Sequence, residues 1–304
     1  MKKNIVLFVT SLLALSCMKE QAPENVVTGN QESQKQFSFS VEATKGTLTK
    51  ALFLEDNTGS GGTETLHAYW KNGEKVAVYF QGSHLGYLTA AVNVNDRSKA
   101  TLSGTLDSVS GLQNGSQLDL LFPRAQWDYS VQTGAAPSED GELSTQFDYA
   151  LATVTVASVD EMSGTIVPVS GASFENQQNI LRFNFETGSA PFVLKSLLIM
   201  DSNYRLVQKH EYQNNAWQST YGGLFIQPAT ATTAPIYAAI RCEDNYSSSQ
   251  PYMFSAVDSD NTLYIGIKSI PHEFRCTKGV FASTTVSVSQ YTIQVKENTT
   301  TDVL

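Results

Sequence analysis

Apolar and polar residues alternate along much of the chain, which is the pattern of strands with one buried face. The alternation is clearest over residues 37–41, 181–185, 263–267 and 291–295. Fuller apolar runs, suited to strands buried on both faces, lie at residues 76–80, 118–122, 154–157, 194–200 and 236–240. No window of helical length keeps a 3.6-residue period. The pattern therefore predicts an all-β protein built from β-sandwiches.

The predicted strands fall into two groups. The chain has 304 residues, which is enough for two domains at about 150 residues per domain. Pro168 and residues 170–172 interrupt the alternation, and it resumes at Asn179. We therefore predict an N-terminal β-sandwich domain over residues 37–170 and a C-terminal β-sandwich domain over residues 171–304.

The first residues have the composition of an export signal. Lys2 and Lys3 precede an apolar run at residues 5–15, which is too short to span a bilayer. Ser16 and Cys17 follow this run, and a cysteine after small residues resembles the lipobox of bacterial lipoproteins. The resemblance implies a signal peptide over residues 1–16, cleavage between Ser16 and Cys17, and fatty acyl chains on Cys17. An ordinary secretory peptide with a chance cysteine is the alternative.

Residues 17–36 are polar and have no apolar period, so they are predicted to form a flexible tether. The formal net charge is −9, which disfavours nucleic acid as a partner. The charge is uneven, because residues 37–170 carry 7 basic and 15 acidic residues. That region is therefore expected to repel acidic glycans as well.

Three ordered groups of segments resemble the fimbrillin families of Bacteroidetes, including the Mfa-like group, whose members form or decorate pili. In the first group, a basic and a small residue are followed by a tryptophan, a Gly-acidic turn and an apolar strand. The second is a strand pair that ends in an aromatic-Pro step, and the third has the opening and a middle strand of a second domain. These groups are residues 49–52 with 70–79, residues 100–105 with 120–123, and residues 174–183 with 236–240.

The resemblance implies two tandem transthyretin-like Greek-key β-sandwiches that assemble by strand exchange. In that scheme a protease removes the N-terminal strand of a lipidated precursor, and a neighbour's strand fills the vacated groove. On this chain the removable strand is expected at residues 36–43, and Lys45 and Lys50 are the candidate processing sites. The best-known members are cut after arginine, whereas no arginine precedes Arg97 here. Either a Lys-tolerant protease acts, or the chain stays uncut as an anchor, tip or adhesin, with Lys50 a solvated strand-end lysine.

The function expected from these features is that of a cell-surface lipoprotein, held in the outer membrane by its lipid, that acts as a structural or adhesive component of fimbriae. Its partners would be other fimbrial subunits, and the sequence leaves open whether residues 286–304 are the donated strand. The four histidines are isolated, with no second ligand at metal-binding spacing. We expect no enzymatic activity, no catalytic residues, no metal and no cofactor.

The remaining candidate residues are two cysteines and two tryptophans. Cys242 and Cys276 are expected to form either a disulfide or two independent buried thiols. Trp127 and Trp217 lie in polar surroundings and are candidate exposed platforms for stacking on sugar rings, whereas Trp70 is expected in the core. A surface glycan-binding lipoprotein is therefore the alternative function.

Overall fold

The structure, a computed structural model, describes residues 35–45, 50–55, 65–213, 216–243, 251–270 and 278–292, with only the backbone described for residues 50–55, 65 and 67. Almost all of its regular structure is β-strand, and α1 (Glu142–Gln146) is a single turn of helix. The predicted all-β fold is confirmed. The transthyretin-like arrangement within it stays a prediction.

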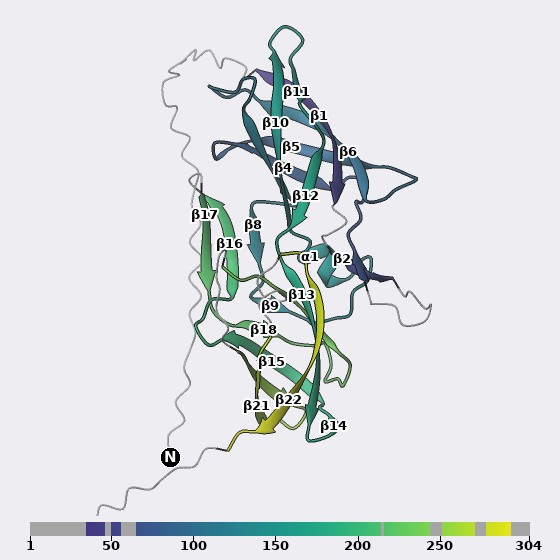
Figure 1. Ribbon diagram of the computed structural model, residues 1–304, viewed down its shortest axis with the longest axis vertical. Coiled ribbons are helices and arrows are strands. Elements are labelled where there is room, and N and C mark those ends of the chain that lie inside the picture. Colours follow the sequence, from purple (N-terminus) through teal and green to yellow (C-terminus); the bar gives the residue numbers. More distant parts are fainter. Residues whose placement is uncertain are drawn as a thin grey trace, which may run out of the picture. The chain divides into compact units, whose positions relative to one another are not determined.

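The first sheet has eight strands and closes on itself (Figure 1). Its order is β11-β1-β12-β10-β7-β4-β5-β6, and β6 pairs in turn with β1. Its strands are β1 (Gln36–Lys45), β4 (Lys75–Phe80), β5 (Ser83–Val92), β6 (Lys99–Asp107), β7 (Gln117–Phe122), β10 (Ala150–Asp160), β11 (Thr165–Pro168) and β12 (Ala172–Asn176).

A second sheet of nine strands has the order β14-β13-β22-β21-β20-β15-β18-β9, with β19 paired to β13. The alternating and fully apolar runs of the second half of the sequence form its main strands. These strands are β9 (Val131–Gln132), β13 (Asn179–Thr187), β14 (Ala190–Pro191), β15 (Leu194–Asp201), β18 (Leu224–Ile226), β19 (Ile236–Ile240), β20 (Tyr252–Asp258), β21 (Leu263–Lys268) and β22 (Phe281–Gln290).

Two small sheets complete the described fold. β8 (Gln126–Asp128), β16 (Val207–Gln213) and β17 (Ala216–Tyr221) form one of them, and β2 (Lys50–Glu55) pairs with β3 (Thr65–His67) in the other. The strand expected at residues 291–295 is not seen where the chain is described, because β22 ends at Gln290 and residues 293–295 lie outside the described residues.

Buried apolar side chains form two separate clusters. One lies inside the first sheet and includes Phe39, Trp70 and Phe174, and the other belongs to the second sheet. Trp127 and Phe147 pack in the second cluster although they precede residue 170, while β12 follows residue 170 and pairs with β1 and β10. The two cores therefore do not follow one cut in the sequence, and the division at residue 170 stays a prediction.

Candidate functional site

The N-terminal strand β1 fills a row of apolar positions in the first sheet. Phe37, Phe39, Val41 and Ala43 are 1–4% exposed, and the residues between them face outward. This strict alternation follows from the sequence, because every second residue from position 37 is apolar. Removing β1 would leave an empty apolar channel along its whole length. We call this channel, with its two flanking strand edges, the β1 socket.

Strands border β1 on both sides. It runs antiparallel to β6 along almost its full length, from Gln36↔Asp107 to Thr44↔Lys99. On the other side it runs parallel to β11 and then to β12 (Figure 1). The socket therefore combines two strand edges with an apolar channel, which is the geometry that β-augmentation requires.

Lys45, the last residue of β1, is a buried cation. Its residue exposure is 3%, and its Nζ donates to three acceptors: the Asp148 carboxylate at 2.7 Å, the Tyr69 carbonyl at 3.2 Å and the Glu74 carboxylate at 3.5 Å. An ammonium group has three protons, so these acceptors satisfy it completely. Lys45 thus joins β1 to residues 69, 74 and 148, which lie far from it in the sequence.

Aromatic rings cover the same ammonium group. Lys45 Nζ lies 3.9 Å from the ring centroid of Phe122 and 4.4 Å from that of Trp70. Trp70 is fully buried, as predicted, and contacts Phe122 and Phe174 edge-on, with ring centroids 5.2 Å apart in each pair. The cation is therefore held by both carboxylates and π faces in a dry environment.

The two acids that pair with Lys45 are themselves partly or fully buried. Desolvation raises the pKa of Glu74 above its usual value, and the charge of Lys45 opposes that rise. Oδ1 of Asp148 is buried and has no hydrogen-bond partner among the described residues. Loss of Lys45 from this position would therefore leave buried negative charge without its counter-ion.

The burial of Lys45 bears on its expected role as a processing site, which stays a prediction. A protease must draw its substrate into a cleft, and Lys45 is inaccessible while β1 occupies its socket. Sequence reasoning missed this burial because lysines are rarely buried, although Lys45 continues the inward-facing series of β1. The other candidate, Lys50, begins β2, and only its backbone is described. Its processing stays a prediction.

Three of the predicted site residues lie outside the described residues. They are Ser16 and Cys17 at the predicted signal cleavage and lipidation site, and Cys276. The proposed disulfide is therefore untested. Its other partner, Cys242, is buried, with Sγ 3.7 Å from the hydroxyl oxygen of Tyr252.

The two candidate stacking tryptophans differ in exposure. Trp127 is 1% exposed and stacks on Tyr149, with its Nε1 donating to the Arg124 carbonyl, so the expectation that it forms an exposed platform is wrong. Its polar neighbours face outward from β8, which is the reason that the sequence context misled. Trp217 is only half-buried, and its ring stacks on His210 at 4.3 Å.

The first five residues of the C-terminal segment 286–304 belong to β22. Val286 and Val288 are at most 2% exposed within β22, which pairs with β13 and β21. Residues 293–304 lie outside the described residues. A donated strand from this end is therefore restricted to the residues after β22.

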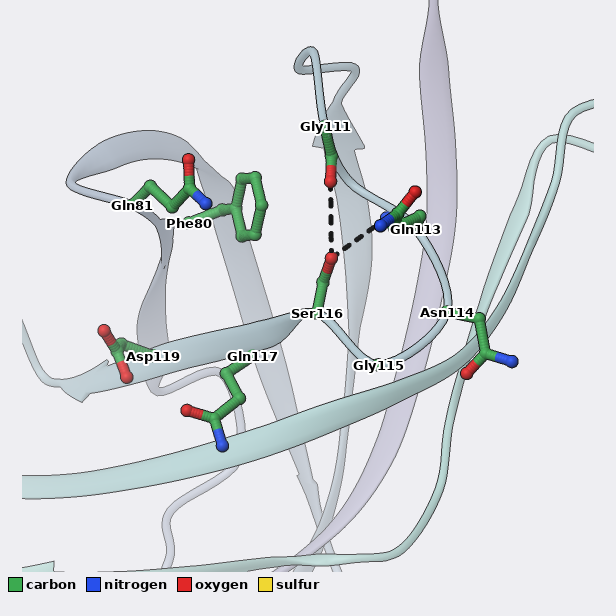
Figure 2. A pocket seen from close by; sticks show the side chains of 9 residues that line it. All are labelled: Phe80, Gln81, Gly111, Gln113, Asn114, Gly115, Ser116, Gln117 and Asp119. Carbon is green, nitrogen blue, oxygen red and sulfur yellow. Dashed lines mark hydrogen bonds between the residues drawn. The ribbon is translucent and has the colours of Figure 1, made fainter.

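A polar hollow of about 610 Å³ lies where β4 ends and β7 begins (Figure 2). Its wall is the loop around Gly111, where Ser116 Oγ accepts a hydrogen bond from the backbone N–H of Gln113 at 3.0 Å and donates to the Gly111 carbonyl at 3.4 Å. Phe80 and Asp119 complete the lining. These hydrogen bonds stabilise the conformation of the loop. Among the residues that line the hollow, they place no nucleophile beside a base.

Two kinds of feature are absent from the described residues. No cluster of three or more His, Cys, Asp or Glu side chains is placed to hold a metal ion. No helix in that part of the chain is long and apolar enough to cross a membrane.

Comparison with known proteins gave matches in structure only. No family model and no curated protein matches the sequence. A proposed cell adhesion protein from Bacteroides uniformis matches 86% of this chain and 98% of its own, with 11% identity and a TM-score of 0.44. A second one, from Bacteroides ovatus, covers 84% of this chain and 95% of its own, with 9% identity and a TM-score of 0.43.

The tip fimbrial protein Mfa3 from Porphyromonas gingivalis also matches. It covers 78% of this chain and 83% of its own, with 10% identity and a TM-score of 0.36. These likenesses lie among cell adhesion and fimbrial proteins of Bacteroides and Porphyromonas, at identities of 9–11%. The function proposed below rests on the chain's own geometry.

Proposed function

We propose that this chain is a cell-surface lipoprotein that serves as a structural or adhesive component of fimbriae and joins its neighbours by strand exchange, in which a strand of another subunit replaces β1. Cys17 would carry the lipid that holds the precursor in the outer membrane. The partners would be other fimbrial subunits, and the proposal includes no catalytic step.

The observation that carries the proposal is the β1 socket. β1 supplies a continuous row of buried side chains and pairs with strands on both of its sides, yet it stands at the N-terminal end of the folded unit that begins at Lys35. A terminal strand can leave without threading the chain through a loop. Another strand of the same pattern can then restore every backbone hydrogen bond and every buried contact, so exchange costs little at equilibrium.

Processing would have to separate β1 from β2. A cut after Lys50 would release residues 17–50, including the lipid anchor and β1, and would leave β2 as the new N-terminal strand. Lys45 does not serve this purpose, because it remains buried as long as β1 is seated. The alternative that stays consistent with the fold is an uncut chain whose own β1 keeps the socket closed, which suits an anchor or terminal subunit.

The decisive experiment is mass spectrometry of the chain in membrane and surface-sheared fractions of cells that express it. We expect an acylated Cys17 at the N-terminus of the membrane form and Ala51 at the N-terminus of the sheared form, with higher-order species only in the sheared material. Lys50→Gln should abolish the Ala51 terminus. Lys75→Gln, an exposed lysine of β4, is the matched control and should leave it intact.

The outcomes of this experiment test strand exchange and lipidation separately. A sheared fraction that holds only soluble monomer with an intact N-terminal region would overturn strand exchange. A mature chain with an unmodified Cys17 would overturn the lipoprotein assignment.

A further inference from the structure

The β1 socket leaves a second feature unexplained, a groove on the outer face of the first sheet. It has a volume of about 550 Å³ and is lined from β7, β10 and β12, with Tyr212 and Trp217 of the β16–β17 hairpin and Lys278 also at its wall. Sites that bind small molecules or short polymer segments have about 300–1,000 Å³. The groove is therefore large enough for a ligand.

A continuous line of rings runs from this groove across β4 and β5. We call it the aromatic row. Successive ring centroids are 4.7, 5.1, 5.2 and 5.3 Å apart, and the rings are, in order, Tyr87, His84, Tyr79, Tyr212 and Trp217. Tyr87 is 52% exposed, His84 is exposed, and the other three are half-buried. The row is thus exposed at its Tyr87 and His84 end, whereas at its other end Trp217 packs against the second core beside Trp127.

A β-bulge places the first rings of the row on one face. In a regular strand His84 and Tyr87 would point to opposite faces, because they are three residues apart. The register between β4 and β5 shifts between Val78 and Tyr79, where Gly86 adopts a φ of +145°. The extra residue on β5 turns His84 and Tyr87 to the same side, where Tyr79 lies opposite His84.

Hydrogen-bonding groups lie beside the rings. Asp119 of β7 lies opposite Tyr79 on one neighbouring strand and opposite Thr153 on the other, and its Oδ1 accepts a hydrogen bond from the Thr153 hydroxyl at 3.1 Å. Burial raises the pKa of Asp119, so its carboxylate is poorly solvated and gains from additional donors. Glu175 is exposed on the same lining.

We propose that the aromatic row and the adjoining groove bind a neutral oligosaccharide. Sugar rings have apolar C–H faces that pack on aromatic rings, and hydroxyl groups that donate to carboxylates. A linear glycan therefore matches both the rings of the aromatic row and the carboxylates of the groove. Acidic glycans are disfavoured, because Asp119 and Glu175 line the groove and residues 37–170 carry 15 acidic against 7 basic residues. A row of five rings favours several linked sugars over a single one.

The inference deepens the adhesive role proposed above and depends on it only for the presence of the chain at the cell surface. Binding is measured on the purified full chain, where neither lipidation nor strand exchange is required. A negative result for glycans would leave the assembly proposal standing, and a failure of assembly would leave glycan binding standing.

The test is an array of neutral linear oligosaccharides of four to ten sugars, including cellohexaose, maltohexaose, mannohexaose and the hexamer of N-acetylglucosamine. Heparin and decaproline serve as probes for an anionic-polymer site and a peptide site. We expect binding of at least one neutral hexasaccharide and weaker binding of its disaccharide. Tyr87→Ala should weaken the hexasaccharide affinity about three- to tenfold, the value expected from the loss of one ring contact.

Asp119→Asn should weaken the affinity about tenfold or more, because a hydrogen bond to a charged acceptor is lost. Tyr291→Ala removes a tyrosine that is 54% exposed and lies off the row, so this matched control should leave affinity unchanged. Thermal unfolding of each variant verifies the fold, and the exposure of Tyr87 makes its variant the safest reporter. Failure of every neutral oligosaccharide to bind, binding of heparin or decaproline alone, or an affinity unchanged in both Tyr87→Ala and Asp119→Asn would overturn the proposal.

Discussion

β1 and β22 occupy comparable places in the two large sheets but contribute very differently to the cores. Each has ten residues, stands near one end of the described chain, and pairs in parallel on one side and antiparallel on the other. β1 buries every second residue from Phe37 to Lys45, whereas β22 buries only Val286 and Val288. The stability of the first sheet therefore depends on its terminal strand far more than that of the second sheet does.

The two strands also differ in polar anchoring. β1 ends in the buried Lys45, which is paired with Asp148, while Ser287 of β22 donates to Glu186 at the surface with a distance of 2.7 Å. A one-residue slip of β1 would turn its apolar row outward and would remove the buried cation from its acids, so its register is specified twice.

The largest expected effect comes from the apolar row. Phe39→Ala should lower the free energy of unfolding by about 3–5 kcal/mol, because a fully buried ring leaves a cavity. Val286→Ala in β22 should cost about 1.5–3 kcal/mol, since less apolar surface is lost. Denaturant titration of both variants measures the difference. Equal losses of unfolding free energy would show that the two strands contribute equally to stability.

Loss of the buried cation should come next. Lys45→Met should cost about 3 kcal/mol, at the lower end of the range for a broken buried ion pair, because the methionine stem refills most of the space while the acids stay buried. The double variant Lys45→Met, Asp148→Leu should recover most of this loss. Ser287→Ala is the matched polar change in β22 and should stay within about 0.5 kcal/mol. A double variant no more stable than Lys45→Met would contradict the ion-pair interpretation.

The smallest expected effect is on the pH dependence of stability, through the acid Glu74 that pairs with Lys45 of β1. The pKa of Glu74 is raised in the folded state by burial, so the folded state binds its proton more tightly than the unfolded chain does. The stability that this group contributes is present in full below its unfolded pKa and is lost as the pH rises through the raised pKa. Unfolding midpoints measured between pH 4 and 8 should therefore fall less steeply with rising pH in Glu74→Gln than in the parent chain. Parallel pH profiles for the two proteins would exclude this role for Glu74.

Local patterns in the sequence predict several of the strands, although the strand expected at residues 291–295 is not seen in the described residues. The alternation at residues 37–41 gives both β1 and its buried face, and the apolar run at residues 236–240 gives β19, all of whose residues are buried. Each of these signals lies within one element. Periodicity therefore predicts an element and its orientation, even though it does not identify the neighbouring strands.

The candidate sites depend on contacts that no local pattern contains. Lys45 continues the inward series of β1, but its counter-ion Asp148 lies 103 residues away. Trp127 is buried between two outward-facing polar residues in a three-residue strand. The aromatic row needs a bulge near Gly86 and a hairpin from the other half of the chain. Only the folded chain brings these residues together, so residue types can be read from the sequence whereas their partners cannot.

The parallel pairing of β1 with β11 and β12 has a consequence for any polymer built on this chain. A strand supplied by a neighbour would have to run in the same direction as β1. In the reverse direction it would not reproduce the pairing of β1 with the flanking strands, and it would not place a cation beside the acids that pair with Lys45. Every junction would then be head to tail, which is the kind of contact that gives open filaments. A filament built in this way would be polar, with an unfilled β1 socket at one end and an undonated strand at the other, so its two ends would differ chemically.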